Sequence, residues 1–167
     1  RIKPDGNVWR VESGFEQHPV VGVNWYGARI YAAWAGAQLP TEAQWEKAAR
    51  GVDGRTYPWG NQEADASLAN FDKNIGGTTP VGSYPGGASP YGLLDMAGNV
   101  WEWCADWYGE TYYKASPPRN PTGPANGGYR VVRGGSWLDG SGLIRAAGRL
   151  WLGPSNLVNF LGFRCAR

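Results

Sequence analysis

Apolar side chains recur at helical spacing twice in the first third of the chain. The first of these segments runs from Trp25 to Ala35. Asn24 precedes it and is a residue type that caps helix N-termini, while Gly36 follows it and can end a helix in the left-handed conformation. We therefore predict a helix over residues 25–35.

A second helix is expected shortly afterwards, and its start signal is stronger. Thr41 and Gln44 have the spacing of a capping box, and Gly51 ends the segment. Residues at positions i, i+3 and i+4 should bury one face of this helix. They are Trp45, Ala48 and Ala49.

Short runs of β-branched and aromatic residues predict several strands between turn residues. One of them is broken by the pair Gly134 and Gly135, and the last ends the chain with alternating apolar and polar residues. The predicted strands lie within residues 8–11, 19–23, 100–103, 130–137 and 161–167.

Much of the remaining chain has no helical or strand period. Residues 52–90 and 108–128 are rich in Gly, Pro, Asn, Ser and Thr and are predicted to be loops. Irregular stretches of this length are uncommon in compact domains unless something ties them internally. Bound cations are one candidate, because carbonyl and carboxylate oxygens are the ligands that calcium takes.

Length and composition indicate one domain, residues 1–167, with a core of large rings, since the chain has ten Trp. The net charge is only +2 and no basic run appears, which argues against nucleic-acid binding. No signal peptide is visible, and no apolar run reaches the roughly 20 residues of a membrane span. The single histidine, His18, argues against a histidine-based zinc site. Cys104 and Cys165 allow one disulfide bridge or none.

The glycine-rich stretches 138–142 and 148–160 are predicted to be loops, yet they carry several large apolar side chains. Because loops run over the surface, such side chains would form an exposed apolar patch of the kind used for binding. The alternative is a small satellite core under the loop. The sequence pattern leaves both possibilities open.

Glu102 stands between Trp101 and Trp103 in a predicted strand, so its carboxylate needs a partner if it is buried. Asp95 and Glu102 could share a cation across the turn at Gly98. The alternative is an ion pair between Glu102 and an arginine such as Arg133 or Arg164, and composition does not decide between the two.

Five motifs in this order resemble the formylglycine-generating-enzyme (sulfatase-modifying factor) family. They cover nearly the whole chain after its first seventeen residues, and they are His18–Val21, Leu39–Glu46, Gly98–Trp103, Arg133–Trp137 and Gly162–Arg164. The resemblance implies an α+β, C-type-lectin-like fold with a small twisted antiparallel sheet, two helices and extensive irregular loops. The family's usual N-terminal strand and helix are not evident.

The resemblance also implies structural calcium, held partly by backbone oxygens. The matching positions form two sets. One consists of Asp95, Gly98, Val100 and Glu102, and the other of Asn70, Phe71, Gly82 and Tyr84.

The enzymes of this family use two cysteines shortly after the Gly-Gly-Ser-Trp motif to hold copper and activate a thiol. This chain has no cysteine between Cys104 and Cys165. Neither Leu138, Asp139 nor Ser141 can replace a thiolate nucleophile. We therefore expect neither copper nor this catalytic activity.

A second branch of the same fold comprises the variable proteins of diversity-generating retroelements, which carry a variable region between these motifs. Mutation of the adenines in an AAC codon never yields Lys, Glu, Gln or Met. The chain has sixteen such residues, and all of them precede Trp137. Trp151 cannot arise from AAC but can arise from AGG.

These observations favour a non-catalytic protein that binds a protein or cell-surface ligand through a variable region at residues 138–160. The alternatives are an inactive relative of the enzymes that acts as a partner or regulator, and an enzyme of the wider family that uses another metal. We expect Leu150, Leu152 and Asn156 to tolerate replacement by Ala, at no more than about 0.5 kcal/mol. Replacement of Trp101 or Trp137, predicted to be buried in the frame formed by the five motifs, should cost roughly 3 to 5 kcal/mol. The predicted ligand-binding residues are Leu138, Asp139, Gly140, Ser141, Leu143, Gly148, Leu150, Trp151, Leu152, Ser155, Asn156, Val158, Asn159 and Phe160.

Overall fold

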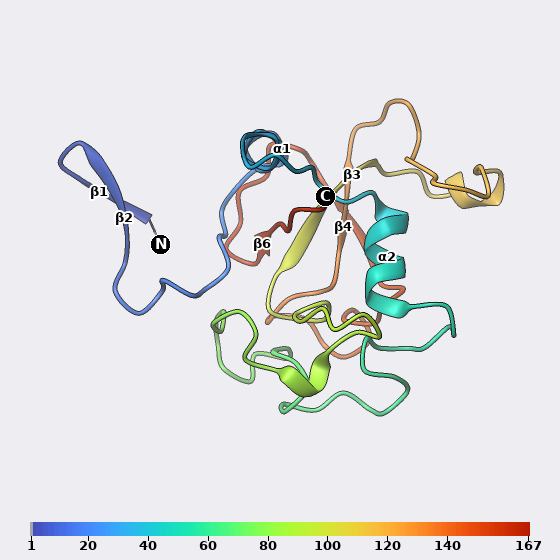
Figure 1. Cartoon of the computed structure of the whole chain (residues 1–167), viewed down its shortest axis with the longest axis horizontal. Coiled ribbons are helices and arrows are strands. Elements are labelled where there is room, and N and C mark those ends of the chain that lie inside the picture. The colour runs from blue at the N-terminus through green and yellow to red at the C-terminus, as the bar shows by residue number, and fades with distance from the viewer. Residues whose placement is uncertain (1) are drawn as a thin grey trace.

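A computed structural model describes residues 2–167 and shows a compact body from which an N-terminal hairpin stands away (Figure 1). The hairpin pairs β1 (Ile2–Asp5) with β2 (Val8–Val11) in an antiparallel sheet. Only its second strand was predicted. All eight residues of the two strands are exposed, so the hairpin adds little to the core.

The body is built on a four-stranded sheet in the order β5-β4-β3-β6. Its strands are β3 (Trp101–Trp107), β4 (Arg130–Arg133), β5 (Arg149–Leu152) and β6 (Leu161–Gly162). The β5-β4 and β4-β3 pairs are antiparallel, whereas β6 lies parallel to β3. With two helices and long loops around this sheet, the predicted α+β, C-type-lectin-like fold is confirmed.

The two predicted helices cover opposite faces of the sheet. Helix α1 (Trp25–Trp34) packs with Val132, and helix α2 (Glu42–Arg50) packs with the preceding residue, Val131. Successive residues of a strand point to opposite faces, which places the sheet between the helices. The predicted start signals are confirmed, because Asn24 caps α1 and the side chains of Thr41 and Gln44 form a reciprocal capping box on α2.

The long stretch after α2 is irregular as predicted, apart from a 3₁₀ turn at Pro85–Gly87. A buried asparagine joins its parts. The backbone N–H of Asn99 donates to the carbonyl of Asn70 at 2.8 Å, and its side chain exchanges hydrogen bonds with the backbone of Thr79 at 3.0 and 3.2 Å. Protein hydrogen bonds therefore supply at least part of the internal tie that the loop composition required.

Three local predictions differ from the structure. Residues 19–23 form no strand, because the chain turns at Gly22 (φ 70°) and its backbone bonds to the loop at Val158. Residues 149–152 form strand β5 instead of a loop. Three successive apolar residues after Arg149 were the signal, and the neighbouring glycines obscured it. The final strand is limited to β6, beyond which Ala166 makes an isolated bridge to Gln38.

Candidate recognition face

We use the term recognition face for the fourteen predicted ligand-binding residues between Leu138 and Phe160. None of them is buried in the structure. Seven are exposed: Gly140, Ser141, Leu143, Trp151, Ser155, Asn156 and Asn159. Seven are partly buried: Leu138, Asp139, Gly148, Leu150, Leu152, Val158 and Phe160. The loop thus combines surface side chains with side chains that hold it to the body.

Asp139 organises the first part of the recognition face. Its Oδ2 accepts hydrogen bonds from the indole N–H of Trp101 at 2.9 Å and from the hydroxyl of Ser136 at 2.5 Å. The Ser136 backbone N–H also donates to this oxygen. Two backbone bonds, from Asp72 to Asp139 and from Lys73 to Trp137, join the same turn to the long irregular loop. Oδ2 of Asp139 is therefore engaged in holding the turn.

A pocket of about 400 Å³ lies beside the far end of the recognition face. Val158 and Asn159 contribute to its lining, together with Trp137 and the glycine-rich loop at Gly76 and Gly77. Trp137 was predicted to be a buried frame residue, but it is only partly buried. The pocket therefore places Val158 and Asn159 of the recognition face next to residues that do not belong to that face.

The apolar side chains of the recognition face follow two courses. Leu150, Leu152, Val158 and Phe160 pack against the core cluster that contains α1, so these four form the satellite core that was one of the two alternatives. Leu143 and Trp151 remain exposed, at 43% and 42% of their surface. Both alternatives are therefore realised, by different residues.

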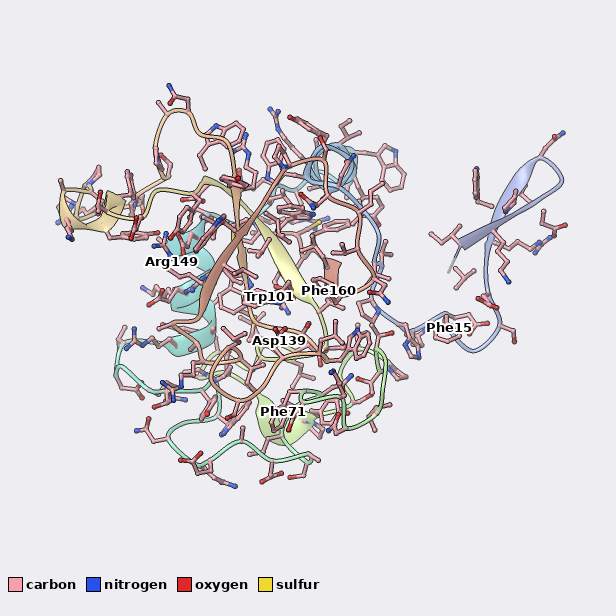
Figure 2. The ribbon with its side chains drawn as sticks, turned by 180° about the vertical axis from the view of Figure 1, so that it is seen from behind. Phe15, Phe71, Trp101, Asp139, Arg149 and Phe160 are labelled. Carbon is pink, nitrogen blue, oxygen red and sulfur yellow. The ribbon has the colours of Figure 1, made fainter. Side chains whose placement is uncertain are left out.

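Trp151 occupies a place of its own. Its ring stacks on Tyr108 with 4.4 Å between centroids, on the sheet face that α2 covers. Arg149, two residues earlier, lies well to the side of Asp139 and Phe160 (Figure 2). The structure thus separates the β5 part of the recognition face from the part around Asp139.

Glu102 is buried, with 5% of its surface exposed, and its partner is an arginine. The guanidinium of Arg164 donates from Nε to Oε2 at 2.6 Å and from Nη2 to Oε1 at 2.7 Å. The indole N–H of Trp45 donates to Oε2 as well. Calcium bound by Asp95, Gly98, Val100 and Glu102 would have to compete with Arg164. Burial raises the pKa of the nearby Asp95 carboxyl.

The second predicted calcium set fits a cation better. The side-chain oxygen of Asn70 is buried and accepts no hydrogen bond, although the amide nitrogen donates to Gly77. A buried polar atom without a partner is costly, and an amide oxygen is a ligand type that calcium uses. Phe71, Gly82 and Tyr84 are partly buried. The backbone N–H of Gly82 donates to Asp95, so the two sets adjoin.

Several groups expected in metal chemistry are absent or inert in the described part of the chain. Among residues 2–167, no three His, Cys, Asp or Glu side chains are placed to hold a metal ion. Cys104 and Cys165 are not bridged; the first is buried and the second is exposed. Burial raises the pKa of the Cys104 thiol well above its ordinary value, which disfavours the reactive thiolate.

Among residues 2–167, no helix is long and apolar enough to cross a membrane.

The sequence pattern did not place Tyr108 beside Trp151, or Trp137 beside Asn159 at the far end of the recognition face. Both come from segments predicted as loop or frame, and only the tertiary structure brings them to Trp151 and Asn159. The only sequence feature that could have indicated the Tyr108–Trp151 contact is the aromatic side chain that follows the last residue of β3.

Comparisons with known proteins agree on the family. The sulfatase-modifying factor enzyme 1-like domain matches residues 3–167. The chain is 52% identical to serine/threonine-protein kinase pkn1 of Chlamydia caviae, over 94% of this chain and 25% of that protein. It is 43% identical to a formylglycine-generating enzyme of Streptomyces coelicolor (92% and 54%) and 42% identical to a hercynine oxygenase of Mycolicibacterium smegmatis (98% and 41%). The chain thus spans between a quarter and about half of these relatives.

Solved structures agree with the fold. Treponema denticola variable protein 1 superimposes with a TM-score of 0.75 at 28% identity, over 88% of this chain and 70% of that one. The P3c variant of the Major Tropism Determinant gives 0.55 at 18% identity, over 85% and 36%, and supports the fold alone. Since the family match spans residues 3–167, this chain belongs to the sulfatase-modifying factor enzyme 1-like domain family.

Proposed function

We propose that this chain is a non-catalytic ligand-binding protein that displays a variable recognition face on a C-type-lectin-like scaffold. The observation that carries the proposal is that buried, hydrogen-bonded motif residues hold a loop that carries exposed side chains. Ser136 is buried, and Asp139 bonds to it and to the core residue Trp101, whereas half of the fourteen recognition residues are exposed. The ligand would be a protein or another molecule of a cell surface, and not a nucleic acid.

The likeness to Treponema denticola variable protein 1, with a TM-score of 0.75 at 28% identity, supports this proposal. The absence of cysteine between Cys104 and Cys165 supports a non-catalytic role. Asp139 lies shortly after the Gly-Gly-Ser-Trp motif, where the family's enzymes carry thiols, and its carboxylate holds the turn instead. We infer that no copper binds there.

A second candidate is favoured by the names of the relatives. Proteins called formylglycine-generating enzyme and hercynine oxygenase are 43% and 42% identical to the chain. An inactive family member that acts as a partner or regulator, or an enzyme that uses another metal, would also be consistent with these identities. The single histidine disfavours the latter.

Structural calcium is also part of the proposal. Asn70 would contribute its unpartnered side-chain oxygen, with backbone oxygens from Phe71, Gly82 and Tyr84. The ion would give the buried oxygen of Asn70 a partner and would hold the irregular loops in place.

The sequence of the gene tests the variable-protein proposal. If adenine-directed mutagenesis of an AAC-rich template produced the recognition face, nearly all of its codons except that of Trp151 should end in C. A near-identical template copy should lie nearby and differ mainly where the template has adenine. Ordinary divergence would not spare the third base, so mixed third bases without a neighbouring copy would favour the inactive-relative candidate.

A further inference from the structure

The two edges of the four-stranded sheet differ. On the β6 side, the segment at residues 20–22 covers the edge: a Cβ on Gly162 would lie 2.5 Å from the carbonyl oxygen of Val20, and Gly22 donates a backbone hydrogen bond to Val158. β5 forms the other edge and pairs only with β4. Within residues 2–167, no other segment makes a backbone hydrogen bond to residues 149–152.

Unpaired backbone groups along a sheet edge are a template for another strand, and natural edges are usually protected by proline, bulges or outward charges. β5 contains no proline, and its pairing with β4 shows no shift in register. Its one charged side chain, Arg149, is turned toward α2, where Glu42 accepts two hydrogen bonds at 2.6 and 2.8 Å. The edge therefore carries no proline, bulge or outward charge, and its remaining protection is its short length of four residues and the inward-pointing Arg149.

Trp151 gives this edge an apolar anchor. The ring is held from one side by Tyr108, and 42% of the residue remains exposed. Aromatic side chains that are fixed before binding are frequent hot spots, because little rotamer entropy is lost.

The carboxyl end of β5 is positively charged. Arg130 lies opposite Leu152 in the ladder. Its guanidinium lies between the rings of Trp25 and Trp107, 3.6 and 3.4 Å from their centres, and donates to the carbonyl of Ala105. The exposed Arg29 lies over the Trp25 ring at 5.6 Å. Neither arginine makes an ion pair with any residue from 2 to 167. An acidic group at this end of the edge would complement them.

We propose that β5 is a docking edge to which a partner protein adds an extended segment as a further strand. The segment places an apolar side chain on Trp151 and an acidic side chain near Arg29 and Arg130. Main-chain hydrogen bonds supply affinity in this binding mode, and alternate side chains supply specificity. This inference rests on the proposed function and names the class of its ligand, an extended acidic polypeptide.

The test selects peptides of about twelve residues from a random displayed library on the intact chain, and then measures the affinity of the enriched synthetic peptides by calorimetry. Trp151→Lys places a charge on the edge and should weaken binding at least about tenfold, which is a typical hot-spot loss. Tyr91→Lys is the matched control, because Tyr91 is an exposed aromatic residue, at 53%, that lies outside both β5 and the recognition face. It should leave the affinity unchanged.

Strand addition also predicts a period of two. N-methylation of successive peptide residues should abolish binding at every second position, because only those N–H groups face β5. Uniform tolerance of N-methylation would overturn the strand-addition proposal. The proposal would also be overturned if no peptide is enriched, or if Trp151→Lys and the wild-type chain bind the enriched peptides with equal affinity. Leu143 belongs to the recognition face but lies outside β5, so loss of binding in Leu143→Lys with binding retained in Trp151→Lys would overturn the β5 proposal and leave the proposed function intact.

A second copy of the chain is the other possible occupant of this edge. Light scattering on the wild-type chain should give a monomer. A dimer that Trp151→Lys dissociates would show that β5 pairs with itself, and the proposal of a separate partner would then be wrong.

Discussion

Single buried carboxylates decide how the helices meet the sheet. Glu102 bonds to Trp45 of α2 and to Arg164 near the chain end, so one side chain links three segments. Asp106 performs a similar task at the other end of β3, where its Oδ2 accepts the backbone N–H of Glu42 at 2.7 Å. Its second oxygen is buried and accepts no hydrogen bond. Burying the ionised carboxylate of Asp106 lowers the free energy of unfolding, and this effect depends on pH because the carboxylate can be protonated.

Burial raises the pKa of Asp106 from 3.8 to about 6, with the charge of Glu42 adding to the effect and Arg130 opposing it. Between these two pH values the folded chain binds a proton that the unfolded chain releases. The contribution of Asp106 to the free energy of unfolding should therefore rise as the pH falls from above 6 to about 4, and then level off. Urea unfolding at a series of pH values measures it. Asp106→Asn should flatten this region, and Asp72→Asn, at an exposed site, should not.

At the scale of elements, β5 shows how one strand can serve both the core and the surface. Leu150 and Leu152 face the cluster under α1, while Trp151 points to the other side and stays exposed. A loop in the same position would place these residues without a fixed direction. The regular pairing with β4 is what sorts them.

This sorting predicts unequal effects of substitution along the recognition face. Asn156→Ala should change the free energy of unfolding by no more than about 0.5 kcal/mol, because Asn156 is exposed. Leu150→Ala was expected from the sequence to have an equally small effect, but it should cost about 1 to 3 kcal/mol because the side chain packs against the cluster under α1. Trp101→Ala should cost roughly 3 to 5 kcal/mol. Chemical denaturation of the three variants gives the order. Equal losses at Asn156 and Trp101 would mean that the loop side chains belong to the core.

For the whole molecule, the sequence was sufficient where the signals were local. The caps at Asn24 and Thr41 and the glycines that end β4 predicted both helices and one central strand. It was insufficient where a residue's role depends on distant partners. The parallel pairing of β6 with β3, the choice of Arg164 over Arg133 for Glu102, and the meeting of Trp151 with Tyr108 all join segments far apart in the chain. Periodicity carries no information about such contacts.

Calcium tests whether the whole assembly of irregular loops depends on a bound ion. If Asn70 supplies a ligand, excess chelator should lower the melting temperature, and calcium should restore it. A ligand at about 100 times its Kd stabilises a fold by roughly 2.7 kcal/mol. Asn70→Leu removes the unpartnered oxygen and should abolish most of the calcium response, while Glu102→Gln, whose carboxylate is paired with Arg164, should retain it. An unchanged melting midpoint, with no metal found by elemental analysis, would leave the Asn99 hydrogen bonds and the Glu102–Arg164 ion pair as the interactions that hold the loops.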